Sequence, residues 1–583
     1  MAPSYFAPPG DESTTALLPA TRSHKDMTAD SSNSPDVPSL VKAPFPRRSA
    51  SCRYWMPFVG VLALLGLASS VLYIPSRRGP PPMDIASPQP PQQSQQPHRM
   101  NETDVMAMIS DLELSSAGIK AQQSIFELLE RQSRTLEQAT SRYSLKSGRS
   151  PPPNFDKWFE FAKENQCLID EYDQIHRDFE PFYQIAQSHP NYFRTMVESG
   201  RNMTLQDPRG LMTIAISNGE VRMPEYQGTS FDGELQTILE QFARVLPDME
   251  FLLNGRDEPR VVYDVRAAGA EEDAVRLKDP DPFRISPVPT SDFFRKQSGC
   301  DVSNAPTGFV SDPVKDIAFL HSSSSSDFTT DLWPVLSMTK ISPCFSDILF
   351  PGVYYYDKTW WSGHFAHPNN VRWANKKPVI YWRGMSNGGH IYGQNYRSFP
   401  RFRLIELARN HSDLIDARMT AFAETHCTED CDRSSIIQEY AIQGPGAPRE
   451  EAYRYKYVLD IDGNTFSGRY LGLLRSGSLV FKSTAFGEFF SDWLKPYEHY
   501  IPVKIDLSDL TEKVEWARQN DEEARAIQMR GMMFAQRVMT DQQNDCYFSA
   551  VLLEWARLQN LAAGNETIVS GGLEEEEKDA TTA

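Results

Sequence analysis

Apolar residues along the chain form short runs separated by stretches with helical spacing. The runs that predict strands cover residues 211–216, 249–254, 261–265, 377–382, 455–461 and 478–482. Apolar residues three and four apart predict amphipathic helices between Asn101 and Arg142 and between Phe155 and Gln187. Strands alternating with helices indicate an α/β fold built in layers.

One apolar run is much longer than the others. Residues 54–74, YWMPFVGVLALLGLASSVLYI, carry no charge, and about 20 apolar residues cross a bilayer as a helix. A secretory signal peptide would start closer to the N-terminus, so we predict a single transmembrane helix. Cations are more numerous before this run (Lys42, Arg47, Arg48, Arg53) than just after it (Arg77, Arg78). The positive-inside rule then places the N-terminus in the cytosol and residues 79–583 in the lumen, a type II topology.

Glycosylation sequons and cysteines agree with that topology. The sequons begin at Asn101, Asn202, Asn410 and Asn565, all after the span. Six of the seven cysteines also follow it, an even number that suits an oxidising lumen, and none has zinc-site spacing. We therefore predict an endoplasmic reticulum or Golgi membrane protein.

Composition divides the chain into segments. We predict a disordered cytosolic tail (1–53), the membrane helix (54–74), a Pro/Gln-rich linker and helical stem (75–150), an N-terminal lobe (151–375), a C-terminal lobe (376–563) and an acidic disordered tail (564–583). The net charge of −18 argues against a nucleic-acid binder, because no positive field would attract a phosphate backbone.

Candidate chemistry gathers in the C-terminal lobe. A predicted strand ends at Arg383-Gly384 and continues into a loop, which is where open α/β sheets bind ligands. Arg401 and Arg403 open a helical pattern, and Ser467-Gly468-Arg469 precedes another. Arginines at helix starts are costly without an anion, because the helix dipole is positive there. The combination favours a phosphate site.

Three other patterns leave alternatives open. Gly384 to Gly388 fits G-x-S-x-G, the nucleophile elbow of serine hydrolases, with Ser386 as nucleophile and an aspartate and His499 later in the chain. Asp460-Ile-Asp462 is a DxD, which ligates Mn²⁺ in many glycosyltransferases, although its place at a strand end before a glycine favours a structural turn. Asp257 follows a predicted strand beside Arg256, where it forms either a general base or an ordinary turn with an ion pair.

The segment from Tyr455 to Asp521 resembles glycosyltransferase family 90, whose members include fungal capsule-type xylosyltransferases and animal protein O-glucosyltransferases. The resemblance rests on YKYVLDIDGNTFSGRYLGLLRSGSLVFK, on KPYEHYIPV, on the strand with Trp-Arg-Gly and on DILFPGVYYYDKTWW upstream. The opening PPPNFDKWFEFAKENQCLIDEYDQI is similar to the fungal branch. In all, the resemblance covers about residues 150–560.

The resemblance implies a GT-B-like enzyme with two Rossmann-like lobes that inverts the anomeric centre of a UDP-sugar. Asn254 to Pro259 matches the family's N-x-R-D-x-P, which makes Asp257 the base. The positions that it implies for the donor are Arg383, Gly384, Ser386, Arg401, Thr465, Ser467, Gly468 and Arg469. Met385 departs from the small hydroxyl residue usual there, and Asp462 has no metal role in the match. The resemblance also implies a Cys167–Cys546 disulfide, leaving Cys427–Cys431 and Cys300–Cys344.

The expected function is therefore transfer of xylose or glucose from UDP to a hydroxyl of a glycan or protein, without a required cofactor. The alternatives are a glycan-binding member that no longer catalyses and a serine hydrolase that uses Ser386. Neither the donor sugar nor the acceptor follows from these residues.

Overall fold

The computed structural model describes residues 116–561, except 226–230, 264–274, 276–282, 284–328, 342–344, 358, 360–370, 390, 392, 425–426, 428–429 and 445. The span predicted at residues 54–74, both predicted tails and the Cys300–Cys344 pair lie outside the described residues. Within the part of the chain that is described, no helix is both long and apolar enough to cross a membrane.

The first of two five-stranded sheets is mixed, with the order β2-β1-β3-β4-β5. β1 (Leu211–Ser217) pairs antiparallel with β2 (Glu220–Arg222) and β3 (Met249–Asn254), whereas β4 (Leu336–Ser337) and β5 (Ile348–Leu349) continue the sheet in parallel. The predicted strands at 211–216 and 249–254 are confirmed. The strand predicted at 261–265 is wrong for its described residues 261–263, where only Val261 forms an isolated bridge, with Thr329.

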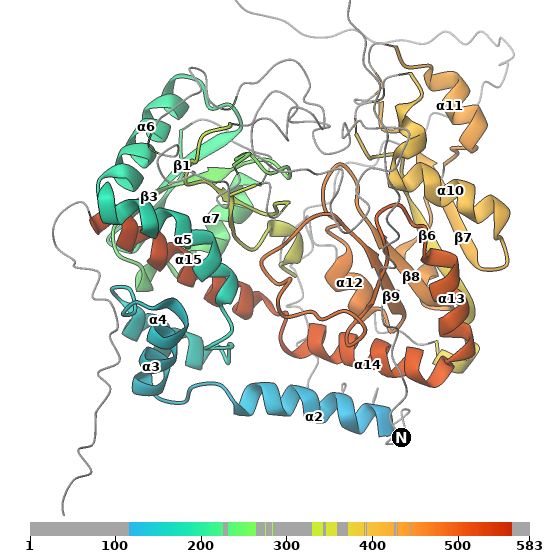
Figure 1. The fold of residues 1–583 in the computed structure, drawn as a ribbon, viewed down its shortest axis with the longest axis horizontal. Helices are drawn as coiled ribbons and strands as arrows, with labels where there is room; N and C mark the ends of the chain where they lie inside the picture. Colours follow the sequence, from blue (N-terminus) through green and yellow to red (C-terminus); the bar gives the residue numbers. More distant parts are fainter. Residues whose placement is uncertain are drawn as a thin grey trace, which may run out of the picture. The chain divides into compact units, whose positions relative to one another are not determined.

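The second sheet is parallel throughout, with the order β10-β9-β8-β6-β7. β6 (Lys377–Met385), β8 (Tyr455–Ile461) and β9 (Leu479–Ser483) confirm three predicted strands, and β7 (Ile415–Ala421) and β10 (Ile501–Pro502) complete the sheet. β9 is buried along its whole length, as expected for a parallel strand with both faces covered. Helices α10 (Pro400–Asn410), α11 (Arg433–Tyr440), α12 (Tyr470–Arg475), α13 (Leu510–Gln519) and α14 (Asp521–Arg537) belong to this lobe (Figure 1).

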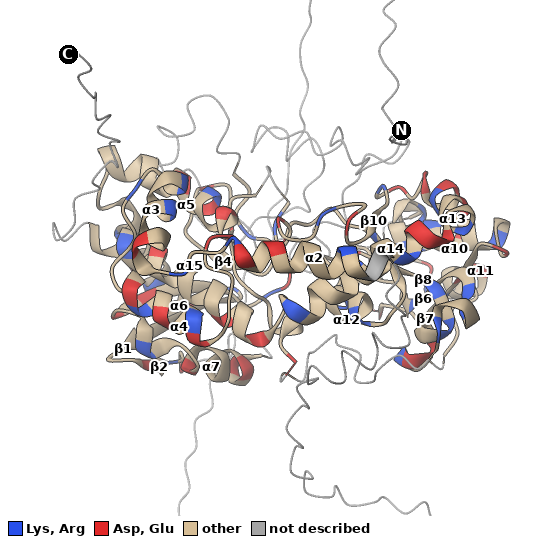
Figure 2. Ribbon diagram, turned by 90° about the horizontal axis from the view of Figure 1, so that it is seen from below, with Lys and Arg blue, Asp and Glu red and all other residues tan. Residues whose placement is uncertain are grey.

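The predicted stem is two helices rather than one. α2 (Ser116–Glu130) ends before a short break, and α3 (Leu136–Ser147) starts where the Thr135 hydroxyl accepts a hydrogen bond from the Gln138 backbone N–H. Gly148 ends α3 with a left-handed backbone (φ 68°). α2 runs along α14 (Figures 1 and 2), so this helix of the stem contacts the second lobe, whereas α3 contacts α4 of the first lobe.

The helical stretch predicted at 155–187 is also divided. It forms α4 (Phe155–Glu164) and α5 (Asp173–Ser188), followed by α6 (Tyr192–Gln206) and α7 (Asp232–Glu240) in the first lobe. The buried face of α4 is aromatic, with Trp158, Phe159 and Phe161. Trp158 also donates a hydrogen bond from Nε1 to the Cys546 carbonyl at 3.0 Å, so α4 is joined to a segment 388 residues later in the sequence.

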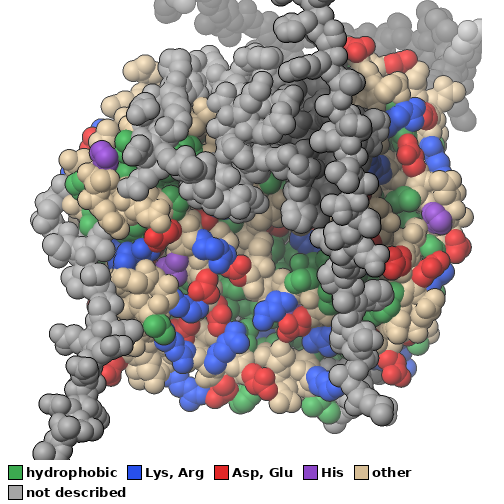
Figure 3. Space-filling view, in the orientation of Figure 1, with side chains coloured by type: hydrophobic (Ala, Val, Ile, Leu, Met, Phe, Trp, Pro, Cys, Tyr) green, Lys and Arg blue, Asp and Glu red, His purple; other side chains and the backbone are tan. Residues whose placement is uncertain are grey.

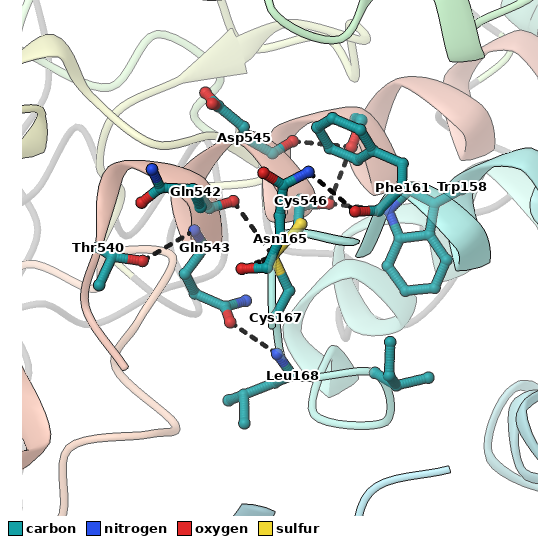
Figure 4. Close-up of a disulfide and its surroundings, with 12 residues drawn as sticks. Trp158, Phe161, Asn165, Cys167, Leu168, Thr540, Gln542, Gln543, Asp545 and Cys546 are labelled. Carbon is teal, nitrogen blue, oxygen red and sulfur yellow. Dashed lines mark hydrogen bonds between the residues drawn. A yellow bond between two sulfur atoms is a disulfide. The ribbon is translucent and has the colours of Figure 1, made fainter. Parts of the chain in front are cut away.

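The last helix, α15 (Asp541–Leu561), leaves the second lobe and lies against the first (Figure 1). Trp555 donates a hydrogen bond to the Glu250 carbonyl of β3 at 2.9 Å. A disulfide joins Cys167 to Cys546 at the start of α15, as predicted (Figure 4). The Cys427–Cys431 disulfide is confirmed as well.

Candidate active site

The loop that carries Asp257 is fixed at both ends by buried polar side chains. Asn254, the fully buried last residue of β3, accepts a hydrogen bond from the Arg256 N–H (3.1 Å) and donates one to the Glu258 carbonyl (2.6 Å). An asparagine that bonds the backbone two residues on is an Asx turn. At the other end, the Asp347 carboxylate accepts the N–H groups of Arg260 (2.8 Å) and Val261 (2.9 Å).

This turn leaves Asp257 partly buried. The Tyr354 hydroxyl lies 3.1 and 2.9 Å from its two carboxylate oxygens and donates to them. Burial raises the pKa of Asp257, and the hydrogen bond from Tyr354 opposes that rise. Glu258 is buried next to it, and burial followed by the charge of Asp257 raises the pKa of Glu258. A carboxylate with a raised pKa is suited to accept a proton.

A second group of candidate residues lies at the carboxyl ends of β6 and β8, which are neighbours in the parallel sheet. The backbone N–H of Gly388 donates to the Asn464 side chain at 3.2 Å, which joins the loop after β6 to the loop after β8. Arg401, from the first turn of α10, donates to the carbonyls of Asp462 (2.9 Å) and Met385 (3.0 Å) and so spans both loops. Loops at this edge of a parallel sheet are the usual ligand position in α/β folds.

Arg401 and Arg469 bring two cations together at this edge. Arg401 is buried, and burial followed by the charge of Arg469 lowers the pKa of Arg401 to about 9. Arg469 donates to the Arg383 carbonyl at 2.8 Å, and both guanidinium groups lie over the Trp382 ring. Among the described residues neither forms an ion pair with a carboxylate. Two such cations suit an anion that carries more than one charge.

The other residues predicted for the donor site differ in what they contact. The Arg383 side chain forms an ion pair with Asp416 of β7 at 2.7 Å. Its contact with Arg469 is made by the Arg383 backbone carbonyl. The Ser386 hydroxyl accepts the Ala423 N–H at 2.9 Å. Gly384 packs against Trp382 so closely that a Cβ would lie 2.6 Å from its ring.

Residues 465–468 lie in the loop between β8 and α12. Thr465 is buried, and its carbonyl accepts the Gly463 N–H at 2.7 Å. The buried Ser467 hydroxyl has no hydrogen-bond partner among the described residues. A buried hydroxyl in that state is rare and is explained where a ligand completes the site. Gly468 lies against Tyr354, because a Cβ there would be 3.0 Å from its ring.

The alternatives raised by the sequence have simpler structural explanations. Asp460 accepts a hydrogen bond from Lys482 at 2.9 Å, and Asp462 accepts the Ala485 N–H at 2.7 Å. The DxD aspartates therefore hold protein groups. His499 accepts the Lys495 N–H at 2.9 Å through Nδ1 and packs on Phe534. Among the described residues, no histidine bonds the Ser386 hydroxyl as a nucleophile elbow would require.

Two residues of this site were not predicted from the sequence, Tyr354 and Trp382. Both lie in segments that carried the family resemblance, DILFPGVYYYDKTWW and the strand with Trp-Arg-Gly. The signal was thus present, but three consecutive tyrosines do not reveal which one meets Asp257.

A parallel sheet with glycine-containing loops and paired arginines at its carboxyl edge defines the second lobe as Rossmann-like. Residues 319–569 match the family model of glycosyl transferase family 90, which confirms the resemblance over that region. The match contains Tyr354, Trp382, Arg401 and Arg469. Asp257 precedes it, and its place beside the matched region comes from the structure.

Curated relatives agree with the family match. The chain is 32% identical over 182 residues to "Protein O-glucosyltransferase 2" of Danio rerio, covering 30% of this chain and 34% of the relative. It is 30% identical over 190 residues to "Protein O-glucosyltransferase 3" of Homo sapiens (32% and 34%). Against "Protein O-glucosyltransferase 1" of Rattus norvegicus it is 29% identical over 236 residues (38% and 57%). The chain thus matches about a third to just over half of these relatives' lengths.

Proposed function

We propose that the chain is a glycosyltransferase that transfers xylose or glucose from a UDP-sugar to a hydroxyl of a glycan or protein, with inversion. The observation that carries this proposal is the link from Asp257 to Gly468 through one side chain. Tyr354 bonds the candidate base and packs against the candidate donor loop. A general base and a diphosphate site therefore meet in one place, as a displacement at a sugar carbon requires.

The proposed reaction is a single displacement. The acceptor oxygen forms a bond to the anomeric carbon, and its proton passes to the Asp257 carboxylate. The bond from that carbon to the UDP oxygen breaks, and UDP leaves with the electron pair. Arg401 and Arg469 offset the charge that grows on the departing diphosphate, through planar donors that suit phosphate oxygens.

We further propose that no metal ion is required. This is supported by the contacts of Asp460 with Lys482 and of Asp462 with the Ala485 N–H, which engage one oxygen of each carboxylate with protein groups. The two arginines supply the positive charge that a divalent cation provides in metal-dependent enzymes. Activity is therefore expected to persist in the presence of a chelator.

The proposed architecture is GT-B-like, with the enzyme anchored in the endoplasmic reticulum or Golgi membrane and its lobes in the lumen. The two five-stranded sheets and the return of α15 to the first lobe support the architecture. For the location, the sequon asparagines Asn202 and Asn410 are both exposed. On the face in Figure 3, acidic and basic side chains are interspersed where described atoms are visible.

The test is the variant Asp257→Asn, assayed for sugar transfer with UDP-xylose and UDP-glucose. Loss of the base is expected to slow transfer by roughly 10²–10⁴-fold, while UDP affinity measured by calorimetry stays within about twofold because Asp257 does not touch the arginines. Asp413→Asn, at an exposed aspartate of the second lobe, is the matched control and should keep the wild-type rate of transfer and the wild-type UDP affinity. Equal loss of transfer and UDP binding in Asp257→Asn would overturn the assignment.

A further inference from the structure

Tyr354 is held between the two lobes by its neighbours in the chain. It is the central residue of a short 3₁₀ helix, Val353–Tyr355, whose other two side chains are fully buried. Tyr355 donates a hydrogen bond to Glu488, which follows β9. The backbone at Tyr354 is therefore anchored independently of its own side chain.

The ring of Tyr354 touches both lobes. Its centroid lies 6.4 Å from that of Phe231 in the first lobe and 5.7 Å from that of Phe466 in the second, both near edge-on. Gly468 closes the contact, since any side chain there would meet the ring atoms at about 3.0 Å. The ring position is thus set by the donor loop as well as by the first lobe.

The hydroxyl of Tyr354 reaches both oxygens of Asp257, at 3.1 and 2.9 Å. Glu258 is buried next to this carboxylate in the chain, and the charges of Arg256 and Arg260 act on Glu258. Burial favours the protonated form of Asp257, and the phenol opposes it by stabilising the carboxylate.

We propose that Tyr354 is a positioning residue that aims the Asp257 carboxylate and sets its distance from the donor loop. The inference rests on the proposed function and adds one residue to it. The hydroxyl of this residue bonds the base, and its ring packs against residues 466–468 of the donor loop. Tyr354 itself transfers no proton. It stabilises the ionised form of Asp257 and holds the carboxylate in one orientation relative to the sugar donor.

The test is Tyr354→Phe, which removes one oxygen and keeps the ring contacts. Without the donated hydrogen bond, the pKa of Asp257 rises, so the base stays protonated to a higher pH. The acid limb of kcat/KM is expected to move up by about one pH unit, and transfer below that limb falls by about tenfold. UDP affinity by calorimetry and the thermal midpoint of the folded protein should stay near the wild-type values.

Tyr192→Phe is the matched control, because the Tyr192 hydroxyl also donates inside the first lobe, to the Leu332 carbonyl at 2.6 Å. A merely structural loss would lower activity equally at every pH in either variant. An acid limb of Tyr354→Phe that coincides with the wild type overturns the inference, whatever the change in overall rate.

The outcome for Asp257→Asn separates this inference from the proposed function. If Asp257→Asn still transfers sugar, the base assignment fails and the proposed mechanism fails with it. If Asp257→Asn is inactive while Tyr354→Phe keeps the wild-type acid limb, only the role of Tyr354 is lost.

Discussion

Arg401 and Arg469 hold their guanidinium carbons 5.5 and 6.0 Å from the centre of the same indole ring, that of Trp382. Two like charges at one ring repel each other, and the lowered pKa of Arg401 records both its burial and that repulsion. An indole face offsets part of this cost by cation–π attraction. An anion between the two guanidinium groups would offset the remaining repulsion. UDP affinity is therefore the property that we expect to change most when either residue is replaced.

Arg469→Ala is therefore expected to weaken UDP binding by about 10–100-fold, the loss of one or two charge-assisted hydrogen bonds. Arg469→Lys should recover only part of that affinity, because a lysine cannot offer two parallel donors. Calorimetry with UDP measures both variants. Arg194→Ala, at an exposed ion pair of α6, serves as the control, and unchanged UDP affinity in Arg469→Ala would remove Arg469 from the site.

The disulfide between Cys167 and Cys546 closes a loop of 379 residues and fastens the first lobe to α15. Its removal in Cys546→Ser is expected to cost roughly 2–5 kcal/mol in the free energy of unfolding, since cross-links over long loops restrict the unfolded chain most. Cys431→Ser breaks a disulfide with a sequence separation of 4 and should cost far less. Chemical denaturation compares the two, and equal losses would contradict the explanation from loop length.

Asp178 and Lys340 form a buried ion pair, with 2.5 Å between Oδ1 and Nζ. The other oxygen of Asp178 accepts the Leu349 N–H at 2.9 Å, so the pair fixes the segment that leads to Tyr354. Asp178→Ala leaves a buried cation unpaired and is expected to destabilise the protein by about 3–5 kcal/mol. Glu198→Ala breaks an exposed pair with Arg194 and should cost less than about 1 kcal/mol. Similar costs by urea unfolding would mean that the pair is not effectively buried.

Strands were predicted best from the sequence where both faces of the sheet are covered. β8 and β9 are mostly apolar and buried almost throughout because they lie inside a parallel sheet. β7 was not predicted, since it is the edge strand and its burial alternates along Ile415–Ala421. β4 and β5 are two residues long and carry no periodic signal, because tertiary pairing alone defines them.

The candidate site shows the same division. The motif around Asn254 is local, because the asparagine bonds its own loop, and a sequence pattern records such contacts. The contact of Tyr354 with Asp257 joins residues 97 positions apart, and nothing in the spacing of either segment specifies it. For Arg383 the sequence pattern suggested a contact that the structure does not have. Its place in the Trp-Arg-Gly strand predicted a donor contact, but its side chain forms an ion pair with Asp416.

The raised pKa of Asp462 leads to a prediction of how the free energy of unfolding depends on pH. Burial raises its pKa from 3.8 to about 7, while the hydrogen bond from the Ala485 N–H opposes the rise. Between pH 4 and 7 the folded protein therefore binds a proton that the unfolded chain has lost, so this residue makes the protein less stable as pH rises through that window. The effect is absent below the unfolded pKa and complete above about pH 7, where it reaches about 4 kcal/mol at most.

Asp462→Asn keeps an oxygen for the Ala485 N–H and cannot ionise. Its free energy of unfolding should equal that of the wild type near pH 4 and exceed it near pH 8, as measured by urea denaturation across the range. Asp432→Asn is the opposing control, because hydrogen bonds from Ser435 lower the pKa of Asp432 and its removal should reduce stability above pH 4. A difference between Asp462→Asn and the wild type that does not change with pH would show that Asp462 is ionised throughout. In that case the buried carboxylate would be stabilised by its neighbours, the Ala485 N–H first among them.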